Sequence, residues 1–270
     1  MKAALRYELA RIRTIRSTYW LSAIALVFGI GLSFLAALGT SISFGTTQPP
    51  TAADAAMMAP GITTQFATFG APYFVAYILA MLGVFAWGHE YRHGMIRATL
   101  TALDSRTRAW VAKYVVVAGW VLLVALVTMV CSALVGWLWL HDDGVPFALS
   151  DLGQVIGRTL LYTLVFTWIA TAFTSLIRNQ TAALVLMFLW PLAFENVITL
   201  ILNVVPGLRD HADVARFLPY TAGSRIIASV DKAHSTFGQP LSLIGAVVVF
   251  GGLTAILMAA SLVLFRSRDA

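Results

Sequence analysis

Six long apolar runs dominate the sequence and constrain its fold more than any other feature. Each is close to the ~20 residues with which a helix crosses ~30 Å of hydrocarbon. In lipid every backbone N–H and C=O group must be paired within the chain, so such runs fold as helices. The sequence therefore predicts an all-α, polytopic membrane protein with six transmembrane helices: Trp20 to Leu38, Ala71 to Trp87, Tyr114 to Leu140, Thr159 to Ile177, Thr181 to Val205 and Leu243 to Phe265.

The composition agrees with a bilayer environment. Hydrophobic residues make up 59% of the chain and charged residues 11%, against roughly 25% charged residues in soluble domains. The net charge of +6 does not indicate a nucleic-acid partner, because the basic residues sit between the apolar runs. A nucleic-acid binder gathers such residues on one folded face. The single cysteine, Cys131, excludes an internal disulfide and a multi-thiolate metal site.

Lysine and arginine predict the orientation of the spans, because cytoplasmic loops of membrane proteins are enriched in both. Thirteen of these residues lie on one side of the predicted spans and five on the other. The first group is Lys2, Arg6, Arg11, Arg13, Arg16, Arg92, Arg97, Arg106, Arg108, Lys113, Arg178, Arg266 and Arg268; the second is Arg158, Arg209, Arg216, Arg225 and Lys232. We therefore expect a multi-pass protein of the bacterial cytoplasmic (inner) membrane with both termini in the cytoplasm.

The segment before the first span has a helical pattern of its own. Apolar side chains recur at steps of three or four at Leu5, Leu9, Ile12, Ile15 and Tyr19, with basic residues largely opposite. This pattern is typical of an amphipathic helix whose apolar face lies in the headgroup region while its cations meet anionic lipid. The sequence predicts such an interfacial helix over residues 1–19 and a six-helix transmembrane domain over residues 20–270. The alternative is a merely basic flank.

The segment 206–242, between the fifth and sixth spans, carries two short helical patterns. The first consists of Leu208, Val214, Phe217 and Leu218, and the second of Ile226, Ile227 and Val230. Pro219 lies between them. Neither is long enough to span a bilayer. We expect an external helical hairpin that lies at the outer leaflet or dips into it.

The densest polar stretch is the loop 88–113 between the second and third spans, and two interpretations compete for it. His89, Glu90 and His93 form an H-E-x-x-H pattern, in which two imidazoles one helical turn apart bind zinc and the carboxylate activates water. This pattern makes an intramembrane zinc metalloprotease the alternative function. However, Gly94 weakens the helix, Arg92 and Arg97 repel a dication, and chance matches to so short a motif are common.

The second interpretation rests on the whole stretch, Glu90-Tyr91-Arg92-x-Gly94-x-Ile96-Arg97-x-Thr99-Leu100, followed by Arg106 and Lys113. It closely resembles the cytoplasmic signature of export-type permeases of ATP-binding-cassette transporters, the type-two class. The resemblance covers most of the chain: it continues in Arg178-Asn179-Gln180 with Ala182, Trp190-Pro191 with Glu195, Leu218-Pro219-Tyr220, and the terminal Phe265-Arg266-Ser267-Arg268-Asp269. His89 and His93 do not belong to that pattern, which favours coincidence for the zinc motif.

The resemblance implies the permease subunit of an ATP-driven exporter, which moves a substrate outward by alternating access. It also implies two separate ATPase subunits and a second permease chain, either another copy or a related chain. The loop that couples the permease to the ATPases then consists of the residues around Glu90, Arg92, Gly94, Arg97, Arg106 and Lys113. The chain contains no G-x-x-x-x-G-K-[ST] phosphate loop. We expect it to be non-catalytic, with no cofactor of its own, and ATP and Mg²⁺ to be bound by the partner.

Glu195 is the one acidic residue well inside a predicted span, about 20 Å along a helix that begins at Thr181. A carboxylate at that depth is costly, so it should face a cavity or a partner helix. Asn196 is the third alternative that the carboxylate could face, and Pro191, one turn earlier, is expected to kink the span. Lining a translocation path and making an interhelical contact are both open roles for Glu195. The sequence also leaves open a non-transporting membrane scaffold, and it does not identify a substrate.

Overall fold

A computed structural model describes residues 1–45, 74–102, 105–141, 149–227 and 241–267. Within these ranges the backbone is helical apart from turns, and no strand occurs. Six helices of the described chain are long and apolar enough to cross a membrane: Arg16–Gly39, Phe74–Arg92, Arg106–Trp139, Leu152–Ile177, Gln180–Val204 and Leu243–Ser267. The prediction of an all-α protein with six membrane-length helices is therefore confirmed.

The helical segments follow one another along the chain with short turns wherever both ends of a connection are described. They are α1 (Lys2–Thr14), α2 (Arg16–Gly45), α4 (Phe74–Arg92), α5 (Ile96–Ala102), α6 (Arg106–His141), α7 (Leu149–Ile177), α8 (Gln180–Leu189), the π-helical η1 (Trp190–Phe194), α9 (Glu195–Val204), the 3₁₀-helical η2 (Arg209–Phe217), α10 (Pro219–Ile227) and α11 (Leu243–Ser267). The fifth span consists of α8, η1 and α9.

Three helices are clearly longer than hydropathy predicts, and one of them, α7, begins at Leu149 rather than at Thr159. The helix of the third span, α6, begins at Arg106 rather than at Tyr114, and that of the first, α2, extends beyond Leu38 to Gly45. Hydropathy misses these ends because polar residues lower the average without interrupting the helix. In the structure, much of the predicted loop 88–113 is helical. Residues 88–92 end α4, α5 lies in the middle, and residues 106–113 begin α6.

The helices α4 and α7 form the most extensive contact of the bundle. Gly83 of α4 faces α7 so closely that a Cβ atom there would lie 2.8 Å from the carbonyl oxygen of Thr167 and would overlap Thr171 Oγ1. Small residues allow this close backbone approach, which drives helix association in membranes where the hydrophobic effect does not.

A row of buried threonines lies along α7, one helical turn apart. Each hydroxyl donates to the carbonyl oxygen four residues earlier, at distances between 2.7 and 2.9 Å, for Thr159, Thr163, Thr167 and Thr171. These bonds satisfy the hydroxyl protons within the helix itself. The row therefore provides small packing surfaces without exposing unpaired donors to an apolar interior.

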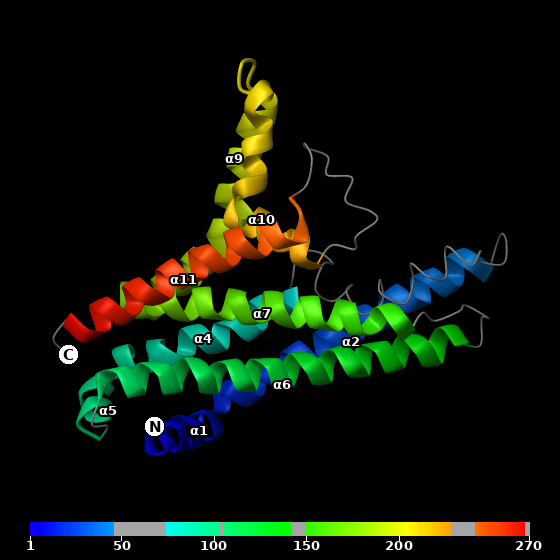
Figure 1. The fold of residues 1–270 in the computed structure, drawn as a ribbon. Helices are drawn as coiled ribbons and strands as arrows, with labels where there is room; N and C mark the ends of the chain where they lie inside the picture. The colour runs from blue at the N-terminus through cyan, green and yellow to red at the C-terminus, as the bar shows by residue number, and fades with distance from the viewer. Residues whose placement is uncertain (46–73, 103–104, 142–148, 228–240, 268–270) are drawn as a thin grey trace.

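The fifth span diverges from the other helices, as Figure 1 shows for α9. Only 17% of its most apolar window is buried, against 72% for the second span. At Pro191 the span leaves the α-helical pattern and forms η1, because proline lacks the N–H group that an α-helical turn requires. The kink expected at Pro191 thus takes the form of a π-helical turn.

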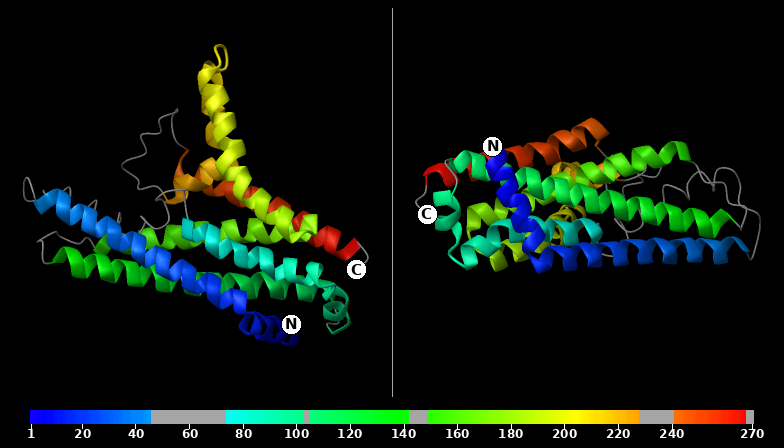
Figure 2. Two further views of the ribbon diagram at one scale, coloured as in Figure 1. Left: turned by 180° about the vertical axis from the view of Figure 1, so that it is seen from behind. Right: turned by 90° about the horizontal axis from the view of Figure 1, so that it is seen from below.

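Figures 1 and 2 show α1, α5 and the C-terminal end of α11 at one end of the bundle, which we name the α5 end. Away from the α5 end, η2 returns alongside α9, while α10 packs mainly against α11 and α7. The two short helices predicted within 206–242 therefore exist, but each contacts a span more than it contacts the other. Residues 228–240 of that predicted hairpin lie outside the described residues.

Candidate functional site

Four charged residues from three helices meet inside the α5 end. Glu8 and Arg11 belong to α1, Glu90 to α4 and Lys113 to α6. Lys113 Nζ lies 2.8 Å from Glu8 Oε1 and 2.8 Å from Glu90 Oε1. Arg11 donates to Glu90 Oε1, and its Nε lies 3.6 Å from Glu8 Oε2. We name these four residues the charge cluster.

The charge cluster is almost completely removed from solvent. The exposed fractions are 0% for the side chain of Lys113, 1% for Glu90 and 3% for Glu8. Two acids and two bases balance, which offsets the cost of desolvating each ion. The Lys113 ammonium also lies 4.7 Å from the centre of the Trp87 ring, and Arg11 donates to the carbonyl oxygen of Ala86. The cluster fastens α1 to α4 and α6.

Both ion-pair partners of Glu90 belong to other helices. Pairing with Arg92 or Arg97 is the nearest choice along the chain, but both of these side chains are exposed, and Glu90 points instead to Arg11 and Lys113. The signal that identifies the other acid of the cluster is the spacing Ala4, Glu8, Ile12, which places Glu8 on the buried face of α1. Of the apolar stripe predicted for this helix, Ile12 is buried, whereas Leu9 and Tyr19 are exposed.

Gly94 ends α4 and turns the chain into α5. Its φ angle is +65°, in the left-handed region where a side chain is disfavoured. The N–H of Met95 donates to the carbonyl of Glu90 at 2.9 Å, and the N–H of Gly94 to the carbonyl of Tyr91 at 3.4 Å. These two bonds form the Schellman motif that closes many helices. The left-handed conformation of this turn therefore requires a glycine, and the turn follows directly after the helix end that carries Glu90 of the charge cluster.

Short polar contacts connect α5 and the start of α6 to neighbouring helices. Tyr7 Oη of α1 lies 3.2 Å from Thr99 Oγ1 of α5. Arg106 donates to the carbonyl of Arg266 at the end of α11, at 3.1 Å, and Arg266 Nε donates to Thr107 Oγ1 at 2.9 Å. A displacement of α5 would therefore also displace α1 and α11, in addition to α4 and α6.

The structure separates the six predicted coupling residues into two groups. Arg92, Gly94 and Arg97 are exposed, and Arg106 is half-buried, so all four lie where a partner can approach. Glu90 and Lys113 are buried within the chain. Any contribution of these two to coupling must therefore be indirect, through the position of the helices that they hold together.

The H-E-x-x-H residues are not arranged around a common point. The ring centres of His89 and His93 are 6.5 Å apart, and His89 stacks on Phe85. The carboxylate of Glu90 is occupied by Lys113 and Arg11. Among the residues that the structure describes, no group of three or more His, Cys, Asp or Glu is placed to hold a metal ion. The geometry gives no support to the zinc interpretation.

The carboxylate of Glu195 is the second polar site of the molecule. Oε1 accepts from the backbone N–H of Tyr220 at 2.9 Å and from Trp190 Nε1 at 3.2 Å. Oε2 accepts from the N–H and the hydroxyl of Thr221, at 2.7 and 2.9 Å. Glu195 is 3% exposed. It thus caps the first turn of α10 from a different helix, where a negative charge complements the helix dipole.

The Asn196 side chain bonds to the backbone of η1 rather than to the Glu195 carboxylate. Asn196 Nδ2 donates to the carbonyl oxygens of Pro191 and Leu192, at 2.9 and 3.0 Å. A π-helical turn leaves carbonyls without their usual partners, and the amide supplies donors for them. Of the two roles that the sequence leaves open for Glu195, the described contacts are those of an interhelical link, between the fifth span and α10.

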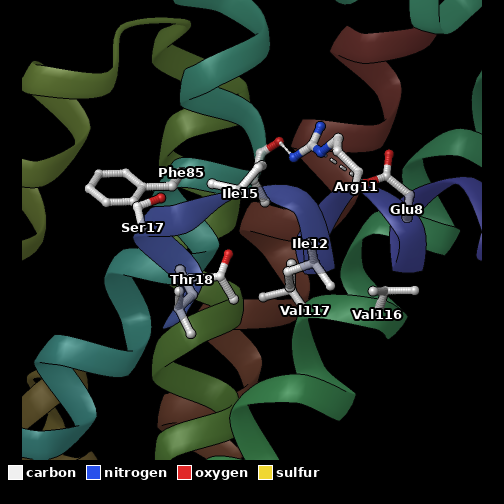
Figure 3. A pocket seen from close by; sticks show the side chains of 11 residues that line it. Glu8, Arg11, Ile12, Ile15, Ser17, Thr18, Phe85, Val116 and Val117 are labelled. Atoms are coloured by element: carbon white, nitrogen blue, oxygen red, sulfur yellow. Dashed lines mark hydrogen bonds and ion pairs between the residues drawn. The ribbon is translucent and has the colours of Figure 1, made fainter. Parts of the chain in front are cut away.

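A small cavity lies beside the charge cluster, at the elbow where α1 meets α2. Figure 3 shows Glu8, Arg11, Ser17 and Thr18 around it, facing Phe85 of α4 and two valines of α6. The elbow forms at Ile15, whose backbone is extended between the two helices. The cavity measures about 20 Å³, enough for a single water molecule. The junction is therefore packed less tightly than the surrounding helices.

A comparison of the chain with protein-family models and with curated proteins finds no match.

Proposed function

We propose that the chain is the permease subunit of an ATP-driven exporter of the ATP-binding-cassette class, in the bacterial cytoplasmic membrane with both termini in the cytoplasm. It exports a substrate by alternating access. Two separate ATPase subunits bind ATP and Mg²⁺. The resemblance of the segment from Glu90 to Lys113 to the signature of such permeases is the basis of this proposal.

The observation that carries it furthest is the placement of α5. This short helix connects the end of α4 to the start of α6, in the part of the molecule where the basic residues gather. Arg97 and Thr101 are exposed on it. A polar helix held between two rigid spans is suited to a re-formable contact with another protein, because electrostatic complementarity gives such contacts specificity and speed.

The charge cluster explains how force on α5 reaches the bundle. The turn at Gly94 fixes α5 to the end of α4, and the next residues enter α6 at Arg106. Glu90 and Lys113 then join these two helices to each other and to α1. In this proposal Arg97 and Arg106 contact the ATPase, whereas Glu90 and Lys113 transmit its movement.

We place α1 along the inner membrane surface. Tyr7 and Leu9 are exposed on this helix, and Tyr19 and Trp20 are exposed at the start of the first span. Aromatic rings are favoured at the membrane interface, and basic residues favour anionic headgroups. On the opposite side, η2 and α10 form the short external helices of the exporter, with α10 held by Glu195.

We infer that the exporter contains two permease chains that meet along the fifth span. Val197, Leu200, Ile201 and Val204 of α9 are all at least 46% exposed. The span also diverges from its own bundle, so its apolar side chains have few neighbours within the chain. A second permease chain, either another copy or a related chain, covers this face.

The test of the function uses Arg97→Ala, with Arg108→Ala as the matched control. Arg108 is also an exposed cation of the α5 end, but it lies on α6 rather than on α5. The tagged chain is purified in mild detergent from membranes of its native host, and ATP hydrolysis of the purified material is measured. Because this chain has no phosphate loop, any hydrolysis reports an associated ATPase.

We expect ATPase recovery to fall at least about tenfold in Arg97→Ala, the loss typical of an interface hot spot. Arg108→Ala should recover as much activity as the parent, and both variants should insert into the membrane normally. Absence of ATP hydrolysis in the parent preparation, or equal hydrolysis in all three, would refute an ATPase contact through α5.

A further inference from the structure

A second cavity lies at the α5 end, apart from the charge cluster. It measures about 390 Å³ and is bounded by the end of α4 and the turn that joins α7 to α8. The described residues that line it are Tyr91, Arg92, Arg178, Asn179, Gln180 and Thr181. All six side chains are polar, two of them are guanidinium groups and none is a carboxylate. We name this cavity the arginine pocket.

The two arginines are placed by different parts of the fold. Arg92 is the last residue of α4. Arg178 adopts φ +57° in the turn after α7, a conformation uncommon for residues with a side chain. Its guanidinium carbon lies 5.8 Å from the centre of the Tyr91 ring. Tyr91 thus holds Arg178 at the edge of the pocket by a cation–π contact.

The turn also leads into the first backbone N–H groups of α8. Asn179 Oδ1 accepts from the N–H of Ala182 at 3.0 Å, and the Asn179 carbonyl accepts from Ala183. The two preceding N–H groups, those of Gln180 and Thr181, have no acceptor within the helix because they belong to its first turn. These donors add to the positive potential of the arginines, which alone give the pocket a charge of +2.

The depth of the arginine pocket indicates the source of its anion. Arg92 ends the second span and Gln180 begins the fifth. Residues at the ends of spans lie at the level of the lipid headgroups, and anionic lipids concentrate in the cytoplasmic leaflet. Guanidinium groups bind phosphate oxygens in bidentate fashion. A lipid phosphate therefore reaches this cavity without leaving the bilayer surface.

We propose that the arginine pocket binds the phosphate of an anionic lipid headgroup. Arg92 and Arg178 are its ligands, and Tyr91 positions Arg178. The site goes beyond the proposed export function, since it requires neither an ATPase nor a transported substrate. A bound lipid would link the end of α4 to the start of the fifth span.

The experiment measures lipid retained by the purified full chain. The protein is reconstituted in nanodiscs of phosphatidylcholine with increasing phosphatidylglycerol, extracted in neutral detergent, and examined by native mass spectrometry. We expect one phosphatidylglycerol to be retained per chain, with affinity reduced about tenfold in Arg92→Ala and in Arg178→Ala. Arg178→Lys should bind more weakly than the parent, because lysine offers no bidentate geometry.

Arg108→Ala is the control, an exposed cation of the same end that does not line the pocket. It should retain the lipid as the parent does. Arg92 is exposed at a helix terminus, so Arg92→Ala reports on the site even if Arg178→Ala disturbs the turn. Equal retention in the parent, Arg92→Ala and the control would overturn the proposal. Complete displacement of the lipid by millimolar inorganic phosphate would assign the pocket to a free anion and overturn the lipid assignment.

Discussion

Lys113 is the residue on which the charge cluster depends most. It contacts both acids, while its own side chain is fully buried beside Trp87. A lysine near a membrane boundary normally extends toward water. Here it extends inward, because Glu8 and Glu90 supply more favourable interactions than the interface does.

Replacement of Lys113 by methionine is expected to destabilise the protein strongly. It leaves two buried carboxylates with Arg11 alone, and breaking one partner of a buried ion pair costs about 3–5 kcal/mol. Thermal unfolding in detergent measures the effect. The double variant Lys113→Met with Glu90→Gln restores neutrality and should be more stable than Lys113→Met alone. If the effects of the two substitutions simply add, the residues do not form one coupled cluster.

At this scale the sequence identifies two residues of the charge cluster but not the residues with which they pair. Glu90 and Lys113 are singled out by their place in the polar segment, but Glu8 and Arg11 lie more than 70 positions away along the chain from Glu90, and no local pattern links them to it. Ion pairs form between residues that the fold brings together, and a local pattern contains no information about that distance.

The short helix α10 depends on an element remote from it in sequence. Its first turn is capped by Glu195, and Tyr220 packs between Phe166 and Phe250. A Cβ atom added to Gly223 would lie 3.0 Å from the Phe250 ring, so α10 also lies close against α11. A helix of this length is not stable alone in water. These tertiary contacts therefore determine its stability.

Glu195→Ala is expected to loosen α10 without unfolding the bundle. The N–H groups of Tyr220 and Thr221 lose their acceptor, so hydrogen exchange of these amides should accelerate markedly. A residue that only lined a path would leave that exchange unchanged. The matched control is Asn203→Ala on the same span, since the Asn203 side chain bonds only within its own helix. Faster exchange of α10 in the control as well would show a general weakening instead.

At the scale of the whole molecule, the fifth span is covered by its own chain as little as the sixth, since 17% of the most apolar window of each is buried. It diverges from the bundle and carries an apolar face over α9. Lipid can cover such a face, as it covers the outside of any span. The divergence distinguishes this span from the others, because a helix that only faced lipid could pack along its neighbours.

A cysteine at Leu200 tests contact between two copies of the chain. Leu200 is 58% exposed on α9. In a Cys131→Ala background, Leu200→Cys should form oxidised dimers in membranes, because copies that meet along this span bring the two thiols together. The control is Ile256→Cys on α11, which is 68% exposed and lies outside the proposed interface. Equal crosslinking at both positions would show random collision, and none at Leu200 would exclude a symmetric contact there.

The sequence by itself determined that this chain forms membrane-length helices, how many there are, and which end gathers the basic residues. These properties follow from local composition, since lipid enforces helical hydrogen bonding on any apolar run of sufficient length. The position of the kink follows equally locally, because Pro191 lacks a backbone donor.

Only the tertiary structure decided how those helices use their polar residues. Glu8 lies on a helix whose apolar stripe predicts only a side that faces the membrane surface, and it is buried because Lys113 and Arg11 balance its charge. Glu195 meets Tyr220 and Thr221 because η1 and α10 place them together. In an apolar interior a polar group is stable only with its partner, so the fold, which sets the distances between remote residues, selects the partner.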